Sequence, residues 1–416
     1  MIKRKYYSDK IANAFDYVPI VVLIGARQVG KTSLMDDYAS NSTSVQNSLK
    51  LNGQNAEIAE LFQKFSTIEQ YLQVYMNEDL RGLLLIDEFQ YIEGISVILK
   101  LLTDKYSELK ILCSGSSSLN ILQNVEESLA GRVRVIEVLS LSFAEYLLFN
   151  NGKTSELYEK LNENTESSVL TAPIEQIYSE YLIYGGFPRA ALAKNREEKA
   201  EILNDIYQTY LLKDVRSFIK NEQTVGFNKI LRMLASQIAN LLNVNELSRE
   251  SGVPYKQCEE FLYLLEQMYI IKLIEPYQVN KRKVITKMKK VFFCDLGLRN
   301  IIERNFNEIN FRADNGAIFE NAVMLELWRR KGAGGELQFY RTADGTEVDF
   351  VLSALTRKTA VECKLKAMTK PVKLIGFENF CNEENIENRF VVNSTLNTLH
   401  NGTHFIQGFL TDKITL

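Results

Sequence analysis

The stretch from Ile20 to Thr32 limits what this chain can fold into more than any other part of it. Its first five residues, 20–24, are all apolar and predict a short buried strand. The loop after them has the spacing G-x-x-x-x-G-K-T, and the residues from Ser33 onward read as the start of a helix. A strand, a glycine-containing loop and a helix in this order are the context of a phosphate-binding loop. The sequence therefore predicts a site for a nucleoside triphosphate, and an incidental glycine turn is the alternative.

The residues of this loop have separate expected roles. Two glycines let successive amides point at phosphate oxygens, and the helix N-terminus adds partial positive charge. We expect Lys31 to reach the β- and γ-phosphates and Thr32 to ligate Mg²⁺. The expected cofactors are ATP and Mg²⁺, and the predicted nucleotide-binding set is Gly25, Ala26, Arg27, Gln28, Val29, Gly30, Lys31, Thr32 and Ser33.

A pair of acids ends the next apolar run. Residues 82–86 read Gly-Leu-Leu-Leu-Ile, which is typical of a central strand in a parallel sheet, and Asp87 and Glu88 follow. Hydrolysis needs a metal-holding acid and a positioned water, so we assign Asp87 to the magnesium ion and Glu88 to polarising the water. Two acids that only cap a helix are the alternative.

Further candidates surround this predicted centre. Ser114 and Ser116 end the next strand, and either hydroxyl could sense the γ-phosphate, although small polar turns are common. Arg132 and Arg189 follow glycine-containing segments and are candidates to neutralise transition-state charge. Either arginine could equally be a surface or packing residue.

Composition narrows the class of protein. A chain of 416 residues predicts two or three domains, and its alternating strands and helices predict an α/β doubly wound sheet. The net charge of −3 excludes a global attraction to nucleic acid. Five widely spaced cysteines without a C-x-x-C pair argue against a zinc ribbon and suit a reducing cytoplasm. The most apolar helix, 261–274, is too short and polar to span a bilayer, so we expect a cytoplasmic protein that does not enter membranes.

The middle of the chain predicts a nucleic-acid-binding module. Residues 244–269 read as a helix, a glycine turn and a second helix, and a β-hairpin with a lysine-rich centre is expected to follow. Its basic residues form a local patch suited to the phosphate backbone of DNA. Glutamates on the second helix would repel DNA, so a protein partner is the alternative. The basic residues are Lys281, Arg282, Lys283, Lys287, Lys289 and Lys290.

Near the C-terminus, acids and a lysine fall on two predicted strands. Alternation puts Glu362 and Lys364 on one face, and an antiparallel neighbour could bring Asp349 to them, with Glu320 on the preceding helix as a fourth member. Two carboxylates and a lysine suit metal-assisted phosphodiester hydrolysis. We assign Asp349 and Glu362 to a second Mg²⁺ or Mn²⁺, and Glu362 and Lys364 to catalysis. Acids that form salt bridges in a scaffold without activity are the alternative.

The order of several motifs is recognisable. They are Gly-Ala-Arg-Gln-Val-Gly-Lys-Thr-Ser-Leu, Leu-Leu-Leu-Ile-Asp-Glu-Phe-Gln, Ser-Gly-Ser-Ser-Ser, Leu-Ala-Gly-Arg, Gly-Gly-Phe-Pro, Lys-Val-Phe-Phe-Cys-Asp-Leu-Gly-Leu and Glu-Val-Asp-Phe. The chain resembles a prokaryotic family of AAA-type ATPases that join an ATPase core to a C-terminal domain called DUF4143. Relatives of that family include archaeal-type ATPases with a fused nuclease-like domain.

The resemblance implies a P-loop core and ATP hydrolysis. Asp349 with Glu362-x-Lys364 also resembles the PD-(D/E)xK nuclease core, although no proline precedes Asp349 and Glu347 stands nearby, which leaves the ligands open. The expected domains are a P-loop core over 1–170, a helical lid over 171–225, a winged helix over 226–299 and a nuclease-like domain over 300–416. We expect an ATP-driven switch or motor on nucleic acid, able to form homo-oligomers. A non-cleaving, ATP-controlled regulatory or protein-binding module is the alternative.

Overall fold

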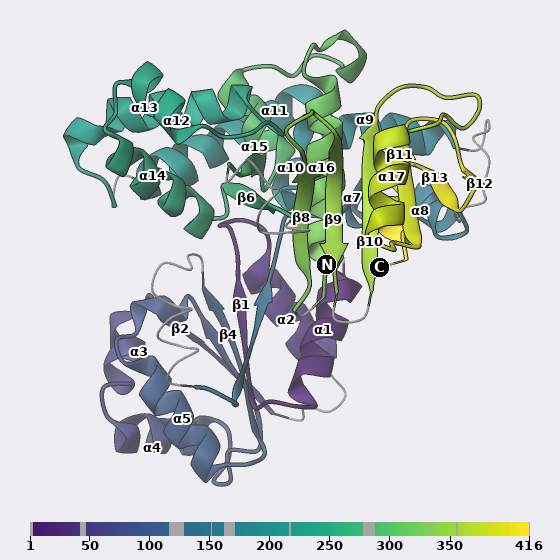
Figure 1. The fold of residues 1–416 in the computed structure, drawn as a ribbon. Coiled ribbons are helices and arrows are strands. Elements are labelled where there is room, and N and C mark those ends of the chain that lie inside the picture. Colours follow the sequence, from purple (N-terminus) through teal and green to yellow (C-terminus); the bar gives the residue numbers. More distant parts are fainter. Residues whose placement is uncertain are drawn as a thin grey trace. The chain divides into compact units, whose positions relative to one another are not determined.

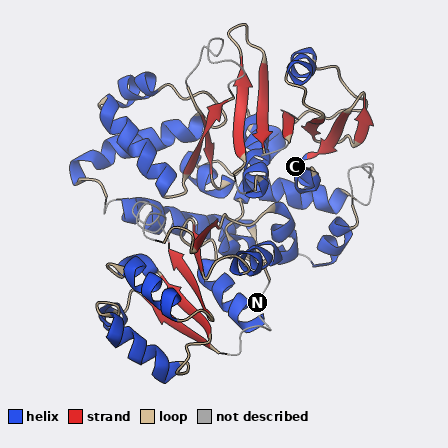
Figure 2. Cartoon of the chain, turned by 60° about the horizontal axis from the view of Figure 1, so that its bottom comes forward, coloured by secondary structure: helices blue, strands red, loops and turns tan. Residues whose placement is uncertain are grey.

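The computed structural model describes most of the chain, and its contacts group the chain into two compact units. The first comprises residues 1–139 with 267–269, and the second comprises 140–266 with 270–416. Each unit has its own sheet, drawn in red in Figure 2. The division into four domains at residues 170, 225 and 299 stays a prediction. The described residues are 3–41, 47–115, 129–150, 152–161, 171–215, 218–277, 288–332, 334–354 and 357–415.

The first unit contains a five-stranded sheet in the order β2-β3-β4-β1-β5, and every neighbouring pair is parallel. Figure 1 shows α1 and α2 on one side of this sheet and α3, α4 and α5 on the other. Covering both faces explains why all of β1 is buried, as its apolar run predicts. The expected doubly wound α/β fold is confirmed. The elements are α1 Lys5–Phe15, β1 Ile20–Ile24, α2 Lys31–Asn41, β2 Ser48–Asn52, α3 Ala56–Leu61, α4 Phe65–Tyr75, β3 Gly82–Asp87, α5 Ile95–Lys105, β4 Leu109–Gly115 and β5 Val133–Glu137.

Two local expectations for this unit are wrong. Apolar residues at spacings of three and four over 58–76 predict one helix, but the structure has two, because the chain is extended at Lys64 between α3 and α4. The polar composition of residues 41–48 predicts a loop that ends at Ser48, but Ser48 begins β2. This edge strand has only Leu51 buried, so it lacks the apolar run that revealed the inner strands.

The second unit begins with helices. From Phe143 the chain is helical, as its pattern predicts. The amphipathic pattern of residues 199–219 predicts one long helix, and the structure shows α11 continued by a π-helical segment, Tyr207–Asp214. The helix–turn–helix expected over 244–269 forms α13, a turn at Gly252 and α14. The helices are α7 Phe143–Asn150, α8 Gly152–Glu159, α9 Ala172–Tyr184, α10 Pro188–Ala191, α11 Arg196–Ile206, α12 Thr224–Ser236, α13 Val244–Ser251, α14 Tyr255–Gln267, α15 Leu296–Glu303, α16 Asn315–Arg330 and α17 Ile375–Glu383.

The second unit also contains an eight-stranded mixed sheet in the order β12-β13-β11-β10-β9-β8-β6-β7. The hairpin was expected over 279–293, and β7 lies in that stretch, but its partner β6 comes from the end of the stretch 261–274 that was expected to be helical. The hairpin joins this sheet because β6 pairs in parallel with β8. Val348, Val351, Phe377 and Phe380 lie in the core under the sheet. The strands are β6 Ile271–Pro276, β7 Lys290–Phe293, β8 Glu336–Arg341, β9 Glu347–Ser353, β10 Lys358–Lys364, β11 Asn388–Asn393, β12 Thr398–His400 and β13 Thr403–Gln407.

Two of the recognised motifs meet inside the second unit. Asp295, at the N-terminus of α15, accepts hydrogen bonds from the amides of Gly186 at 2.8 Å and Leu298 at 3.0 Å. Gly185 has a φ of +68°, and a Cβ there would stand 2.3 Å from Asp295 Oδ1. The Gly-Gly-Phe-Pro and Cys-Asp-Leu-Gly motifs therefore build a structural joint between α9 and α15.

Candidate functional site

The loop after β1 lies at the carboxyl edge of the first sheet, and β3 and β4 end at the same edge. Gly25 and Gly30 have φ values of +151° and +91°, which residues with a Cβ rarely adopt. A Cβ on Gly25 would lie 2.1 Å from the carbonyl oxygen of Val138. The backbone curl that the G-x-x-x-x-G-K-T spacing predicts therefore depends on glycine here.

Lys31 is the first residue of α2, and its side chain turns back over the loop. Its Nζ donates to the carbonyl oxygens of Gly25 at 2.9 Å and Ala26 at 2.7 Å. Burial lowers the pKa of Lys31 to about 8, and the charges of Glu88 and Asp87 oppose this shift. The ammonium is thus held by neutral backbone oxygens.

Asp87, at the end of β3, links the first turn of α2 to the end of β4. Thr32 donates its hydroxyl to the Asp87 carboxylate, at 2.9 Å from Oδ2 and 3.1 Å from Oδ1. Ser114, which is fully buried in β4, donates to Asp87 Oδ1 as well. Three side chains predicted separately, from α2 and from the ends of β3 and β4, therefore share one set of hydrogen bonds.

Glu88 begins the turn after β3 with a φ of +53°, a conformation that is sparsely populated outside glycine. Its amide lies 3.4 Å from the Ser114 hydroxyl, and its Oε2 accepts from Gln90 Nε2 at 2.5 Å. Backbone strain of this kind is commonly found at functional sites. Gln90, which fixes the direction of the Glu88 carboxylate, was not predicted.

Arg4 was also missed by sequence reasoning. It is only 5% exposed, and its guanidinium donates to the carbonyl oxygens of Val29 at 2.8 Å and Leu139 at 3.0 Å. The first contact ties the phosphate-loop backbone to the start of α1. The sequence shows only an aromatic residue, Tyr7, three positions after Arg4, and in the structure the guanidinium lies 4.5 Å from the centre of that ring.

In the second unit, one lysine lies among three carboxylates. Lys290, in β7, is 3% exposed, and its Nζ lies 2.9 Å from Glu320 and 2.5 Å from Glu347. Asp349 Oδ1 is 3.8 Å from the same nitrogen. Burial opposes the charge on Lys290, yet the carboxylates together raise its pKa above the ordinary value. Burial and the Asp349 charge raise the pKa of Glu320 to about 8.

The predicted triad of Asp349, Glu362 and Lys364 comes together next to this lysine. The antiparallel register of β9 and β10 pairs Phe350 with Val361 and so sets Asp349 opposite Glu362. Lys364 Nζ lies 2.5 Å from Glu362, and Asp349 Oδ2 accepts from the amide of Cys363 at 2.8 Å. Burial and the Asp349 charge raise the pKa of Glu362 to about 7. Across the described part of the chain, no group of three or more His, Cys, Asp or Glu side chains is arranged to hold a metal ion.

Comparison with known families agrees with this geometry. The "AAA domain" matches residues 18–147, and "Domain of unknown function (DUF4143)" matches residues 315–408. Residues 18–147 are therefore similar to AAA-type P-loop ATPase domains, and residues 315–408 are similar to DUF4143 domains. Between the two, residues 175–308 match "Domain of unknown function (DUF8612)", which the sequence analysis did not foresee.

Similar proteins cover most of this chain. An uncharacterized protein of Methanocaldococcus jannaschii is 25% identical over 375 residues, which are 86% of this chain and 80% of that protein. An uncharacterized protein of Haemophilus influenzae is 26% identical over 363 residues, 84% of each. A Walker-type ATPase of Pyrococcus abyssi with a solved structure covers 73% of this chain and 96% of its own, at 15% identity and a TM-score of 0.48.

Of the two arginines predicted to neutralise charge, Arg132 lies away from the loop and Arg189 belongs to the second unit. Arg132 precedes β5, whose first residue pairs with Ile20, so it lies at the amino edge of the sheet, opposite the loop's edge. It pairs with Asp104 at 2.7 Å. Arg189, in the second unit, lies 3.7 Å from Asp205. Within its own chain, Arg132 is therefore not positioned to contact a phosphate at the loop. Ser116 lies outside the described residues.

The predicted basic patch is reduced in the structure. Lys290 is buried among carboxylates and cannot contact a phosphate backbone, so its assignment to DNA was wrong. Lys289 is half-exposed and pairs with Glu275 at 2.9 Å. The other four, Lys281, Arg282, Lys283 and Lys287, lie outside the described residues.

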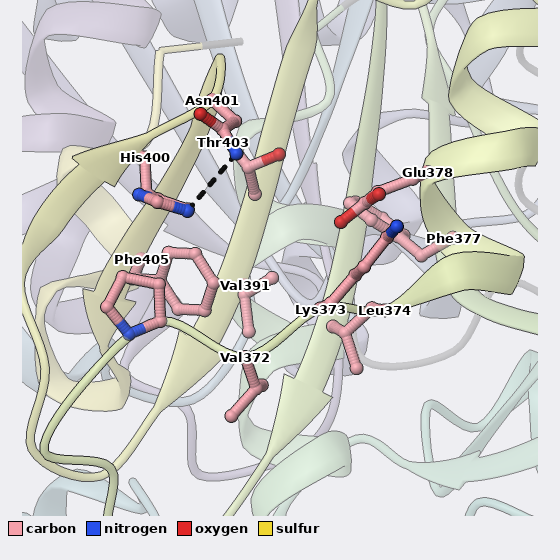
Figure 3. Close-up of a pocket in the computed structure, with 11 residues that line it drawn as sticks. Val372, Lys373, Leu374, Phe377, Glu378, Val391, His400, Asn401, Thr403 and Phe405 are labelled. Carbon is pink, nitrogen blue, oxygen red and sulfur yellow. Dashed lines mark hydrogen bonds between the residues drawn. The ribbon is translucent and has the colours of Figure 1, made fainter.

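A cavity of about 330 Å³ opens in the DUF4143 domain, lined by residues from the start of α17 and the β12–β13 hairpin. Figure 3 shows His400, Lys373 and Glu378 around it, with His400 hydrogen-bonded to Asn401 at 3.2 Å. His404 pairs with Leu399 and so points to the opposite face of the hairpin from His400.

No described helix is long and apolar enough to cross a bilayer.

Proposed function

We propose that the ATPase domain binds ATP on the loop of residues 25–33 and hydrolyses it with Lys31, Thr32, Asp87, Glu88 and Ser114. The observation that carries this proposal is the hydrogen bond between Thr32 and Asp87, which joins the helix after β1 to the end of β3. The loop amides and the N-terminus of α2 supply the positive end of a dipole for the phosphates. Lys31 exchanges two backbone carbonyl partners for phosphate oxygens.

The same residues fit a magnesium ion. Mg²⁺ prefers hard oxygen ligands and is usually bound by one or two carboxylates together with substrate phosphates. Thr32 and Asp87 present a hydroxyl and a carboxylate side by side, and Thr32 would be its direct ligand. When bound, the ion would neutralise charge that develops on the phosphates.

Glu88 is the proposed base that orients the attacking water. Its carboxylate is held by Gln90, and the Ser114 hydroxyl links the Glu88 amide to Asp87. This network couples the metal-holding acid to the residue that positions water. Ser114 is thus placed to respond to the γ-phosphate.

Turnover measurements with three variants test the assignment. Lys31→Ala should lose ATP affinity, Glu88→Gln should bind ATP without releasing phosphate, and Asp87→Asn should lose the dependence of binding on Mg²⁺. Lys358→Met, in the DUF4143 domain, is the control and should hydrolyse ATP at the wild-type rate. ATP binding that is indifferent to both Lys31→Ala and Mg²⁺ would refute the proposal.

We further propose that the ATPase acts as a switch on nucleic acid. The α13–turn–α14 arrangement and the basic residues of 281–289 support this, since such residues suit phosphate backbones. A filter-binding titration with duplex DNA tests it, because affinity should fall steeply as salt rises. ATPase rates with and without DNA then show whether binding is coupled to hydrolysis.

For the DUF4143 domain there are two candidates. A metal-dependent nuclease is supported by the register that sets Asp349 opposite Glu362 with Lys364 alongside. A non-cleaving regulatory module is favoured by the ion pairs that already engage these acids. A nicking assay with Mg²⁺ or Mn²⁺ on the wild type and Lys364→Ala separates them, because only a nuclease loses cleavage with the lysine.

A further inference from the structure

Lys290 lies among carboxylates beside the predicted triad of Asp349, Glu362 and Lys364. A site for metal-assisted phosphodiester hydrolysis would need carboxylates of this kind to hold a divalent cation. Here Glu320 comes from α16, and Glu347 and Asp349 come from β9, with oxygens 2.9, 2.5 and 3.8 Å from the Lys290 ammonium. The lysine belongs to β7, outside the Asp349 and Glu362-x-Lys364 motif.

The position of Lys290 is set by its surroundings. Its backbone pairs with Ile274 of β6 and with Leu241, so the residue is fixed in the sheet from both sides. Its Nζ also lies 5.5 Å from the centre of the Phe339 ring. A side chain that is 3% exposed and enclosed in this way cannot swing into solvent to admit an ion.

The charge of the cluster is nearly balanced without a metal. Arg341 also pairs with Glu347 at 2.7 Å, and Lys364 pairs with Glu362 at 2.5 Å. The cluster therefore has four carboxylates and three cations, which are Glu320, Glu347, Asp349 and Glu362 with Lys290, Arg341 and Lys364. One formal negative charge remains, so a divalent ion would reverse the sign of the cluster. The residues present therefore do not fit a catalytic metal.

We propose that Lys290 is the resident cation of this cluster and that the DUF4143 domain neither binds Mg²⁺ or Mn²⁺ there nor cleaves nucleic acid. This inference rests on the non-cleaving candidate for that domain and is independent of ATP binding by Lys31. The carboxylates then serve to join α16, β7 and β9 through ion pairs with Lys290. Asp349 also joins β9 to β10, because it accepts a hydrogen bond from the amide of Cys363.

Binding of Mn²⁺ to the full chain without nucleotide tests the proposal. In the wild type, electron paramagnetic resonance should detect no Mn²⁺ site that depends on Asp349. The Mn²⁺ signal should therefore be the same in the wild type and in Asp349→Asn. Lys290→Met keeps a side chain of similar length but leaves the carboxylates in excess, so it should gain such a site. Its melting temperature should fall in metal-free buffer and recover with Mn²⁺. Any Mn²⁺ signal lost in Asp87→Asn instead belongs to the ATPase domain.

Lys358→Met is the matched control. Lys358 lies in the same sheet and pairs with Glu384 at 3.0 Å, outside the cluster, so its variant should not gain a Mn²⁺ response. If Lys290→Met does not fold, the wild-type measurement alone decides. Wild-type Mn²⁺ binding or DNA nicking that disappears in Asp349→Asn would overturn the proposal. Failure of ATP binding by the wild type would refute the ATPase assignment and leave this inference standing.

Discussion

Two buried lysines show how differently the two units use the same side chain. Lys31 is 6% exposed and donates to two backbone carbonyls, whereas Lys290 is 3% exposed and is surrounded by carboxylates. Burial lowers the pKa of Lys31 to about 8, but the pKa of Lys290 is raised because its anionic partners outweigh burial. Burial alone therefore does not tell whether a lysine is ready for a ligand.

The two lysines differ in how easily a ligand can replace their hydrogen-bond and ion-pair partners. A carbonyl dipole holds an ammonium only moderately, so phosphate oxygens can replace it. A buried carboxylate left without its cation pays a large desolvation cost, so the lysine among carboxylates stays where it is. Lys31 is therefore suited to binding a ligand, whereas Lys290 is suited to stabilising the fold.

The first expected effect is on ATP binding. Lys31→Ala should weaken ATP binding by about a hundredfold, since a buried charge-assisted contact is lost. It should not lower the free energy of unfolding, because burying this lysine is itself unfavourable. Equilibrium dialysis and urea denaturation measure the two quantities. An unfolding free energy that falls as far as in Lys290→Met would erase the contrast between the lysines.

The second effect is on stability. Lys290→Met should lower the free energy of unfolding by about 3 to 5 kcal/mol, because three largely buried carboxylates lose their shared cation. Urea denaturation of the full chain measures it. Lys31→Met serves as the comparison and should change stability far less. Equal losses in both variants would contradict the structural role given to Lys290.

The third effect is on pH dependence. The folded-state pKa of Lys31 is about 8 and lies below its unfolded value of 10.5, so the free protein loses this proton as pH rises through 8. ATP affinity should therefore fall above pH 8, by up to about tenfold per pH unit. Binding there should take up a proton, which calorimetry in buffers of different ionisation heat detects. Since the unfolded chain binds more protons between these values, the stability contribution of Lys31 should rise across that window.

The smallest effect concerns the support of the loop. Arg4→Lys keeps the charge but loses the fork that reaches both Val29 and Leu139, so it should cost about 1 kcal/mol of stability. ATP affinity should fall only slightly. Hydrogen exchange of the loop amides would locate the change. If exchange increases elsewhere and not in residues 25–30, Arg4 does not support the loop.

Local signals explain what the sequence could predict. The loop, β1 and β3 are continuous motifs, and acids at the ends of apolar strands meet at one sheet edge, so Thr32 and Asp87 could be paired in advance. Arg4 could not be assigned, because its partners lie 25 and 135 residues away. Lys290 was read with five other basic residues as solvent-exposed, yet it begins the apolar run Val291–Phe293, and that neighbourhood was the available clue.

The pairing of β6 with β8 limits where the chain can be truncated for study. A fragment that starts at residue 300, or at 315 where the DUF4143 match begins, omits β6 and β7 and uncovers the edge of β8. It also removes the backbone that carries Lys290. Bare edges invite pairing between molecules, so such a fragment should aggregate, whereas one beginning before Ile271 keeps the sheet closed on that side.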